Sequence, residues 1–367
     1  MVRSILFAAA ALAVSVSAAP LSKQNMFLIS TAPGSTQEVT EAQKYELKAQ
    51  GVRFFDVTEE GSAPDELEVA AVTYPTAVQQ TAAVNALIPS LTEANIKTSL
   101  TTFSSFHNRY YKSAYGTQSS AWLLKQVQSI ITAAAPSANV TATPFAHTWD
   151  QPSVIAHIPG TTDNLVVLGA HQDSINARSP MNGVAPGADD DGSAAMELLE
   201  TFRVLLTDAK VAAGEATNSI EFHWYSAEEG GLLGSKAIFN SYKADGKVVK
   251  AMLNQDMAGY VKPGTTESIG LFADYVDTSL TTFIGKVIAA YTKLPAVSTK
   301  CGYACSDHAS ARSAGYPTAL ISEAAFEDTS QLLHTAQDTL DTITFSHIVE
   351  LAKVALGTAY ELGFATL

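Results

Sequence analysis

Leu165-Val-Val-Leu-Gly-Ala-His171 and, further along the chain, Pro186-Gly-Ala-Asp-Asp-Asp-Gly-Ser193 are the two stretches that decide the fold. The first is a short apolar run, typical of a buried strand, and it ends in His171. The second is a Pro/Gly/Asp turn, and the pattern of residues 194–206 after it predicts a helix. Three adjacent carboxylates repel one another. The turn is therefore either solvated, with Asp191 capping the helix, or gathered around a cation.

Apolar runs alternate with helical patterns along most of the chain, and this alternation predicts an α/β fold. We expect a three-layer sandwich in which a mostly parallel central sheet is flanked by helices. The expected strands are residues 154–158, 165–170, 220–225, 249–254 and 318–321. The expected helices are residues 78–88, 92–106, 119–135, 194–206, 232–242, 279–291 and 347–362. Residues 76–367 are long enough to form this sandwich as one large domain.

Residues 1–19 have the pattern of a secretory signal. Met1-Val-Arg3 precedes the apolar run from Ile5 to Val16, and small residues follow that run. A membrane anchor would need about 20 apolar residues, and this run is shorter. We therefore expect cleavage after Ala18 or Ala19 and a secreted, extracellular protein.

Residues 20–75 differ in composition from the rest of the chain. They combine loops containing Ser, Thr and Gly with one helical pattern at 41–50 and one strand-like run at 52–57. The segment is charged and has few apolar residues per turn. It is therefore either a pro-segment that is removed on maturation or a surface subdomain that the mature protein keeps.

The composition limits partners and compartment. A net charge of −14 makes the surface acidic, which disfavours nucleic acid and anionic membranes as partners. The sequence has two cysteines, Cys301 and Cys305, and in an exported protein their spacing favours a disulfide over a zinc site, which would need more Cys or His nearby. Asn139 begins an Asn-Val-Thr acceptor, and we expect it to carry a glycan.

Polar side chains gather at the ends of the expected strands. They are His171 at the end of one strand, Asp190 on the loop after it, Glu228 and Glu229 after the next strand, and Asp256 after another. Each alone has an ordinary explanation, such as a solvated turn, an acid at a helix N-terminus or a hydrogen-bonded core histidine. Together they would meet where open α/β sheets bind ligands, outside the carboxyl ends of the strands. Carboxylates and an imidazole at such a buried edge predict a catalytic zinc site.

Six stretches resemble, in order and spacing, the secreted co-catalytic di-zinc aminopeptidases, in particular the fungal leucine aminopeptidase type. They are His171-Gln-Asp-Ser174, Ala185-Pro-Gly-Ala-Asp-Asp-Asp-Gly-Ser193, Ser226-Ala-Glu-Glu-Gly-Gly-Leu-Leu-Gly-Ser235, Gln255-Asp-Met257, Cys301-Gly-Tyr-Ala-Cys-Ser-Asp-His308 and Leu333-His-Thr335. The resemblance covers nearly everything after about residue 73. It implies a zinc exopeptidase fold, with residues 76–367 as the catalytic domain and residues 20–75 as a pro-segment.

The resemblance also implies a set of metal ligands for two zinc ions per subunit. His171 and Asp256 would bind one ion, and Glu229 and His334 would bind the other. Asp190 would bridge the two ions, because a carboxylate has two oxygens. Its neighbours in the turn would then only shape the loop and cap the following helix.

Three further positions receive roles from the same resemblance. Asp173 would hold the free ring nitrogen of His171 and so fix its tautomer. Glu228, which is not a ligand, would act as general base towards a hydroxide shared by the two zinc ions. Tyr303, in the loop closed by the two cysteines, would donate its hydroxyl to the substrate carbonyl oxygen.

These roles imply a secreted zinc-dependent aminopeptidase, a hydrolase that removes N-terminal residues from peptides. We expect a preference for leucine or other large apolar residues, because Met257, Phe326 and Leu333 lie beside the motifs and could line the substrate pocket. The expected partners are peptides with a free N-terminus, with no nucleic acid and no membrane, and we expect a monomer.

Other functions of the same fold make different demands on the sequence. A carboxypeptidase should carry a basic clamp for the C-terminal carboxylate, and only Arg178 and Arg312 lie near the motifs. A one-metal glutaminyl cyclase does not need all five ligands. A non-catalytic ectodomain would be expected to have lost ligands or Glu228, and the sequence keeps them all.

Overall fold

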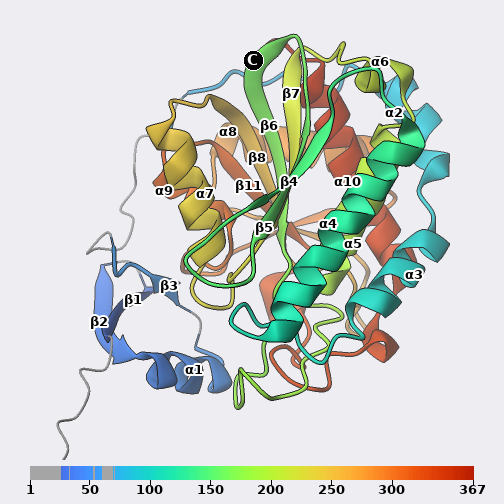
Figure 1. Ribbon diagram of the computed structural model, residues 1–367. Coiled ribbons are helices and arrows are strands. Elements are labelled where there is room, and N and C mark those ends of the chain that lie inside the picture. Colours follow the sequence, from blue (N-terminus) through green and yellow to red (C-terminus); the bar gives the residue numbers. More distant parts are fainter. Residues whose placement is uncertain (1–25, 33, 53, 60–68, 70) are drawn as a thin grey trace, which may run out of the picture.

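Strand β6 (Thr162–His171) lies in the middle of a large twisted sheet (Figure 1). The structure is a computed structural model, and it describes residues 26–32, 34–52, 54–59, 69 and 71–367. Within this part of the chain, eight strands form the sheet. From edge to edge they are β10 (Ala296–Thr299), β9 (Ile269–Phe272), β11 (Thr318–Ser322), β8 (Val249–Gln255), β6, β7 (Asn218–Tyr225), β5 (Ser153–Ile158) and β4 (Thr141–Phe145).

The inner strands β11, β8, β6 and β7 are parallel to one another. β5 and β4 add antiparallel strands at one side, and at the other side β9 is antiparallel to β11 and parallel to β10. The prediction of a mostly parallel central sheet is therefore confirmed. His171 pairs with Tyr225, and Gly169 pairs with Asn254. Because of this register, β6, β7 and β8 end at the same edge, and the residues that follow them meet there.

Helices cover both faces of the sheet, as the predicted three-layer sandwich requires. One face packs against α3 (Glu93–Phe103), α4 (Ala114–Ala134), α5 (Gly192–Leu205), α8 (Thr278–Tyr291) and α10 (Phe345–Gly363). The other face packs against α7 (Leu233–Ala244) and α9 (His308–Ser313), on the left of Figure 1. The shorter helices are α2 (Thr81–Leu87), α6 (Ala209–Ala212), and the 3-10 turns Ile88–Ser90, Phe326–Asp328 and Leu340–Thr342.

Strand β6 is apolar on both sides because helices cover both of its faces. Val166 and Leu168 belong to the apolar cluster formed with α5 and α10, while Leu165 and Val167 belong to the cluster formed with α7 and α9. This two-sided burial explains why the run is continuous in the sequence rather than alternating. It also holds the end of β6, and with it His171, in a fixed place.

The N-terminal segment forms a small sheet of its own, seen at the lower left of Figure 1. β1 (Met26–Ala32) pairs antiparallel with β2 (Ser35–Thr40) and with β3 (Phe55–Asp56), and helix α1 (Glu41–Ala49) joins β2 to the chain before β3. The predicted helix and the short strand after it are present. The expectation of loops before the helix is wrong, because β1 and β2 pair. β2 is mostly exposed and polar, so its sequence lacks the apolar alternation that indicates a strand.

The other sequence predictions for the sandwich domain hold to within a few residues at most element ends. All predicted strands and helices of that domain are present, whereas β4, β9, β10, α6 and α9 were not predicted. These are short elements, and the strands among them lie on the outer part of the sheet. The expected signal at residues 1–19 lies outside the described residues.

The buried centre of β6 should be the most sensitive part of the fold. Leu168→Ala removes a fully buried side chain and should lower the free energy of unfolding by about 2–5 kcal/mol. Val297→Ala on the edge strand β10, where the side chain is 37% exposed, should change it by less than about 0.5 kcal/mol. Urea denaturation of both variants measures the difference. Equal losses would show that the core does not lie at β6.

Candidate metal centre

The predicted ligands come together at the carboxyl edge of the sheet, from five separate places in the sequence. They are His171 at the end of β6, Asp190 in the turn before α5, Glu229 after β7, Asp256 after β8, and His334 in the long loop after β11. Asp190 and His334 lie on loops, at some distance along the chain from the strands that precede them. The structure thus places all five predicted ligands in one cluster.

The cluster consists of two groups of three potential ligands, and Asp190 belongs to both groups. In the first, His171 Nε2 lies 3.0 Å from Asp190 Oδ1 and 3.8 Å from Asp256 Oδ1. In the second, His334 Nε2 lies 3.0 Å from Asp190 Oδ2 and 3.3 Å from Glu229 Oε2. Asp190 therefore presents a different oxygen to each group, which is the geometry of a bridging carboxylate.

The donor set fits zinc. Each group offers one imidazole nitrogen and carboxylate oxygens, and its ligand atoms lie within 4.8 Å of one another. Asp190 is 6% exposed, Glu229 1% and Asp256 8%, so three carboxylates are largely withdrawn from water. Buried carboxylates need compensating positive charge, and two histidines alone cannot supply enough of it.

Asp173 supports both the histidine and the loop that carries the two glutamates. The ring nitrogen Nδ1 of His171 lies 3.1 Å from the backbone oxygen of Asp173 and 3.5 Å from its carboxylate. The same carboxylate accepts hydrogen bonds from the backbone N–H groups of Glu228 (3.0 Å) and Glu229 (3.2 Å). The second contact was not foreseen, and it links β6 to the loop after β7.

The other two aspartates of the turn have structural roles. Asp191 caps helix α5 by accepting from the N–H of Ala194, and it also accepts from the N–H groups of His171 and Met257. Asp189 accepts from the N–H of Gly259. Both carboxylates are therefore engaged with backbone groups, as expected for residues that shape the loop rather than bind metal.

Two residues that fix this turn were missed in the sequence. The carboxylate of Asp338 accepts from the N–H groups of Asp189 (2.9 Å) and Asp190 (3.0 Å). Arg109 is fully buried, and its guanidinium donates to the carbonyl oxygens of Gln172, Pro186 and Gly187. Arg109 lies in an aromatic stretch of the sequence, which predicts a residue that packs a helix. For Asp338, the only sequence signal was its position close to the His334 motif.

The remaining predicted residues lie around the ligand cluster. Glu228, Met257 and Tyr303 line one small cavity together with four of the five predicted ligands, all except Glu229. Glu228 belongs to neither of the two groups of potential metal ligands. Burial raises the pKa of Glu228, although the positive charges of Lys48 and His171 oppose that rise. Cys301 and Cys305 form the predicted disulfide beside Tyr303.

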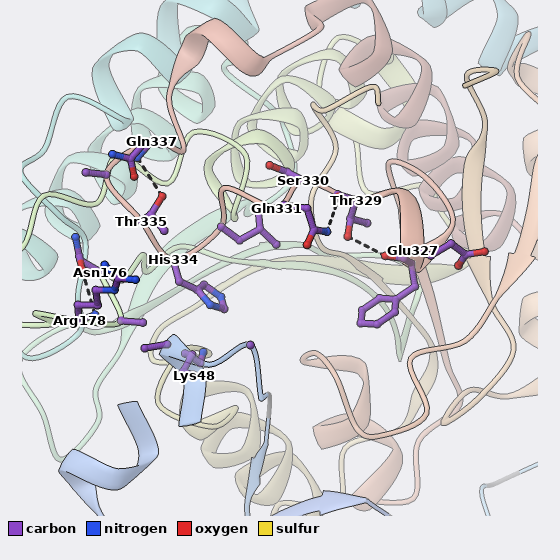
Figure 2. A pocket seen from close by; sticks show the side chains of 16 residues that line it. Lys48, Asn176, Arg178, Glu327, Thr329, Ser330, Gln331, His334, Thr335 and Gln337 are labelled. Carbon is purple, nitrogen blue, oxygen red and sulfur yellow. Dashed lines mark hydrogen bonds between the residues drawn. The ribbon is translucent and has the colours of Figure 1, made fainter. Parts of the chain in front are cut away.

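A larger cavity of about 840 Å³ opens beside His334. Phe326 and Leu333 line it, so two of the three predicted pocket residues face this cavity rather than the ligand cluster itself. Figure 2 shows Lys48 beside His334, with Arg178 on one side of the cavity and Glu327 on the other. The ligand cluster therefore adjoins a space large enough for a peptide side chain or a short peptide.

Residues 153–359 match the description "Peptidase family M28". The chain belongs to this family. It is 52% identical to Leucine aminopeptidase 1 of Ajellomyces dermatitidis over 348 residues, which cover 93% of this chain and 90% of that protein. It is also 51% identical to Leucine aminopeptidase 1 of Colletotrichum graminicola over 350 residues, 94% of this chain and 87% of the relative. This M28 peptidase is a zinc-dependent aminopeptidase hydrolase.

The fold of the M28 chain also matches solved aminopeptidase structures. The crystal structure of the LapA aminopeptidase of Legionella pneumophila superposes with a TM-score of 0.82 at 25% sequence identity. The match covers 94% of this chain and 100% of LapA, so it includes much of the chain before the family match as well as the sandwich.

Asp173 gives a test of how the predicted zinc ligands of this M28 peptidase are held in place. Asp173→Asn should lower zinc affinity about 10- to 100-fold, because the amide supports His171 and the loop after β7 less well than a carboxylate does. Asp163→Asn, at the exposed start of β6, makes the same change of charge and should leave zinc affinity unaltered. Titration with a zinc-selective dye under buffered free zinc measures both. Equal affinities in the two variants would remove Asp173 from this supporting role.

Proposed function

We propose that this protein is a secreted di-zinc aminopeptidase that prefers peptides beginning with leucine or another large apolar residue. The observation that carries the proposal is Asp190, which presents one oxygen to each of two ligand groups. One group would hold a zinc ion through His171 and Asp256, and the other through Glu229 and His334. The names of the fungal relatives support the preference for leucine.

When bound, two zinc ions would lower the pKa of a shared water and polarise the scissile carbonyl. Glu228 lies beside the ligand Glu229 in the loop after β7 and lines the same cavity as the ligands. Its carboxylate would accept a proton from the attacking water and return it to the leaving nitrogen as the C–N bond breaks. The reaction then leaves a carboxylic acid and a free amine, with no net change at Glu228.

Tyr303 and the apolar residues would position the substrate. The Tyr303 hydroxyl would donate to the substrate carbonyl oxygen as negative charge develops there. Met257 would line the space beside the ligands, and Phe326 and Leu333 the larger cavity next to it. The acidic groups of the cluster favour a free substrate ammonium, which limits cleavage to the first peptide bond.

Maturation and export belong to the same proposal. Residues 1–19 would be removed as a signal, residues 20–75 would be a pro-segment, and residues 76–367 would be the catalytic domain. Asn139 is exposed just before β4 and would carry a glycan. None of the helices in the described residues has the length and apolar character needed to cross a membrane. We propose a monomer acting on free peptides.

The role of Glu228 can be tested separately from metal binding. Glu228→Gln should keep two zinc ions per chain but lower kcat about 10²- to 10⁴-fold, because the amide cannot accept the proton from water. Glu215→Gln at an exposed position is the matched control and should keep full activity. Leucine p-nitroanilide turnover and metal analysis of the mature protein measure both. Unchanged turnover would show that another group is the base.

The requirement for a free N-terminus can be tested with blocked substrates. Leucine p-nitroanilide should be cleaved faster than the lysine or aspartate analogue, and N-acetyl-leucine p-nitroanilide should be cleaved about 10⁴-fold more slowly, because it lacks the ammonium group. A chelator should abolish cleavage, and added zinc should restore it. Equal rates on blocked and free leucine substrates would contradict the assignment as an aminopeptidase.

A further inference from the structure

Helix α1 of the N-terminal segment inserts a lysine into the ligand cluster. The Lys48 side chain, in the last turn of α1, is 7% exposed, and its ammonium group forms an ion pair with Oε2 of Glu229. The same ammonium nitrogen lies 4.0 Å from Oε2 of Glu228. Lys48 lines the small cavity together with His171, Asp190 and His334. A residue outside the catalytic domain thus supplies positive charge to the predicted zinc site.

Lys48 contacts the same oxygen that would bind a metal ion. Oε2 of Glu229 lies 3.3 Å from Nε2 of His334, and these two atoms belong to the second ligand group. A zinc ion held by them would share Oε2 with the ammonium group of Lys48. Two cations on one buried oxygen repel strongly, because little water is present to screen their charges.

A second lysine of the helix holds the segment in this position. Lys44 is 2% exposed, and its ammonium group donates to the carboxylate of Asp56 (2.7 Å) and to the backbone oxygen of Gly230 (2.6 Å). Gly230 directly follows Glu229. The anchor of the segment is therefore the loop that carries both the predicted base and one predicted zinc ligand.

Strand β3 makes a close backbone contact with the same loop. The N–H of Asp56 donates to the backbone oxygen of Gly231 (3.3 Å), and Lys236 on α7 donates to the backbone oxygen of Asp56 (3.0 Å). A Cβ atom at Gly231 would come within 2.8 Å of the Asp56 side chain, and Gly231 has a φ of 109°. Both the positive φ and the close approach favour glycine at this position, so Gly231 allows β3 to lie directly against the loop.

Apolar contacts complete the docking of the segment. Phe55 and Val57 pack with Leu232 and Ala309 of the catalytic domain, and Tyr45 packs with Tyr110. These residues are buried on both sides of the contact. Apolar burial and the hydrogen bonds of Lys44 therefore hold the segment in place. Docking does not depend on Lys48 alone, and the charge of Lys48 faces the predicted metal ligands.

We propose that docking of residues 26–59 and binding of zinc at the Asp190, Glu229 and His334 group oppose each other, with Lys48 taking the place of the second zinc ion. The inference rests on the proposed two-metal function and adds how that site is regulated. The uncleaved protein holds its second zinc weakly, and removal of the segment raises the affinity for that ion. Lys48 then replaces the positive charge of the metal ion and also occupies part of the small cavity.

The coupling between zinc and the segment must be reciprocal. If the docked Lys48 weakens zinc binding at the second group by some factor, zinc bound there weakens docking by the same factor. Couplings of this kind commonly amount to about 5- to 150-fold. Zinc should therefore loosen α1 even before the chain is cleaved.

The test compares uncleaved wild type with Lys48→Met, which keeps the length of the side chain and removes its charge. Metal analysis over a series of buffered free-zinc concentrations should show that Lys48→Met fills its second zinc site at a free zinc concentration about 5- to 150-fold lower than wild type needs. Lys112→Met is the matched control, because Lys112 pairs with Glu41 at the exposed side of α1 and does not reach the ligands. It should bind zinc as wild type does.

The outcomes separate this inference from the proposed function. If all three proteins fill two sites at the same free zinc, the inference is overturned and the two-metal site stands. If none of them binds a second zinc ion at any concentration, the proposed two-metal function itself fails.

Hydrogen exchange of the wild-type protein gives a second readout that needs no substitution. Filling of the second zinc site should raise the exchange rate of the amides in α1 (Glu41–Ala49), because zinc displaces Lys48. The amides of α10 should be unaffected, since that helix packs in the core of the catalytic domain. Unchanged exchange in α1 with two zinc ions bound would overturn the inference.

Discussion

The buried carboxylates at the end of the sheet are the constraint on which the rest of the structure depends. Asp190, Glu229 and Asp256 are nearly inaccessible to water, and withdrawing ionised carboxylates from water is costly unless positive charge compensates them. In the structure, Lys48 and the two histidines supply part of that charge. In the proposed active form, zinc ions supply it. The parallel strands, the Asp-rich turn and the Arg109 and Asp338 contacts all serve to hold these groups in place.

Much of the α/β sandwich and of the predicted ligand cluster could be foreseen, because the sequence signals for them are local. The apolar run before His171 and the alternation of strands and helices after it predicted the sandwich, and strands that end at one edge predicted that their flanking residues would meet. Asp191 could be foreseen as the cap of α5 because an Asp before an apolar helical run is a common N-cap. His334 lies far along the loop after the predicted strand 318–321, and only the resemblance to di-zinc aminopeptidases pointed to it.

What the sequence did not reveal depends on contacts between distant residues. Arg109 donates to three carbonyl groups around the Asp-rich turn, and nothing in its aromatic surroundings predicts that. The sequence of β2 is too polar and exposed to predict a strand. β2 forms because β1 pairs with it. Lys48 looks like an ordinary basic residue in the last turn of a helix. Its contact with Glu229 depends on the packing of the N-terminal segment against the sandwich, which the sequence does not reveal.

The central claim is that Asp190 bridges two zinc ions between the two ligand groups. Crystals of the mature protein grown with zinc, measured at the zinc absorption edge, test it most directly. The account predicts two anomalous peaks, one on each side of the Asp190 carboxylate, the first beside His171 and Asp256 and the second beside Glu229 and His334. A single peak at saturating zinc, or a second peak away from Glu229 and His334, would contradict it.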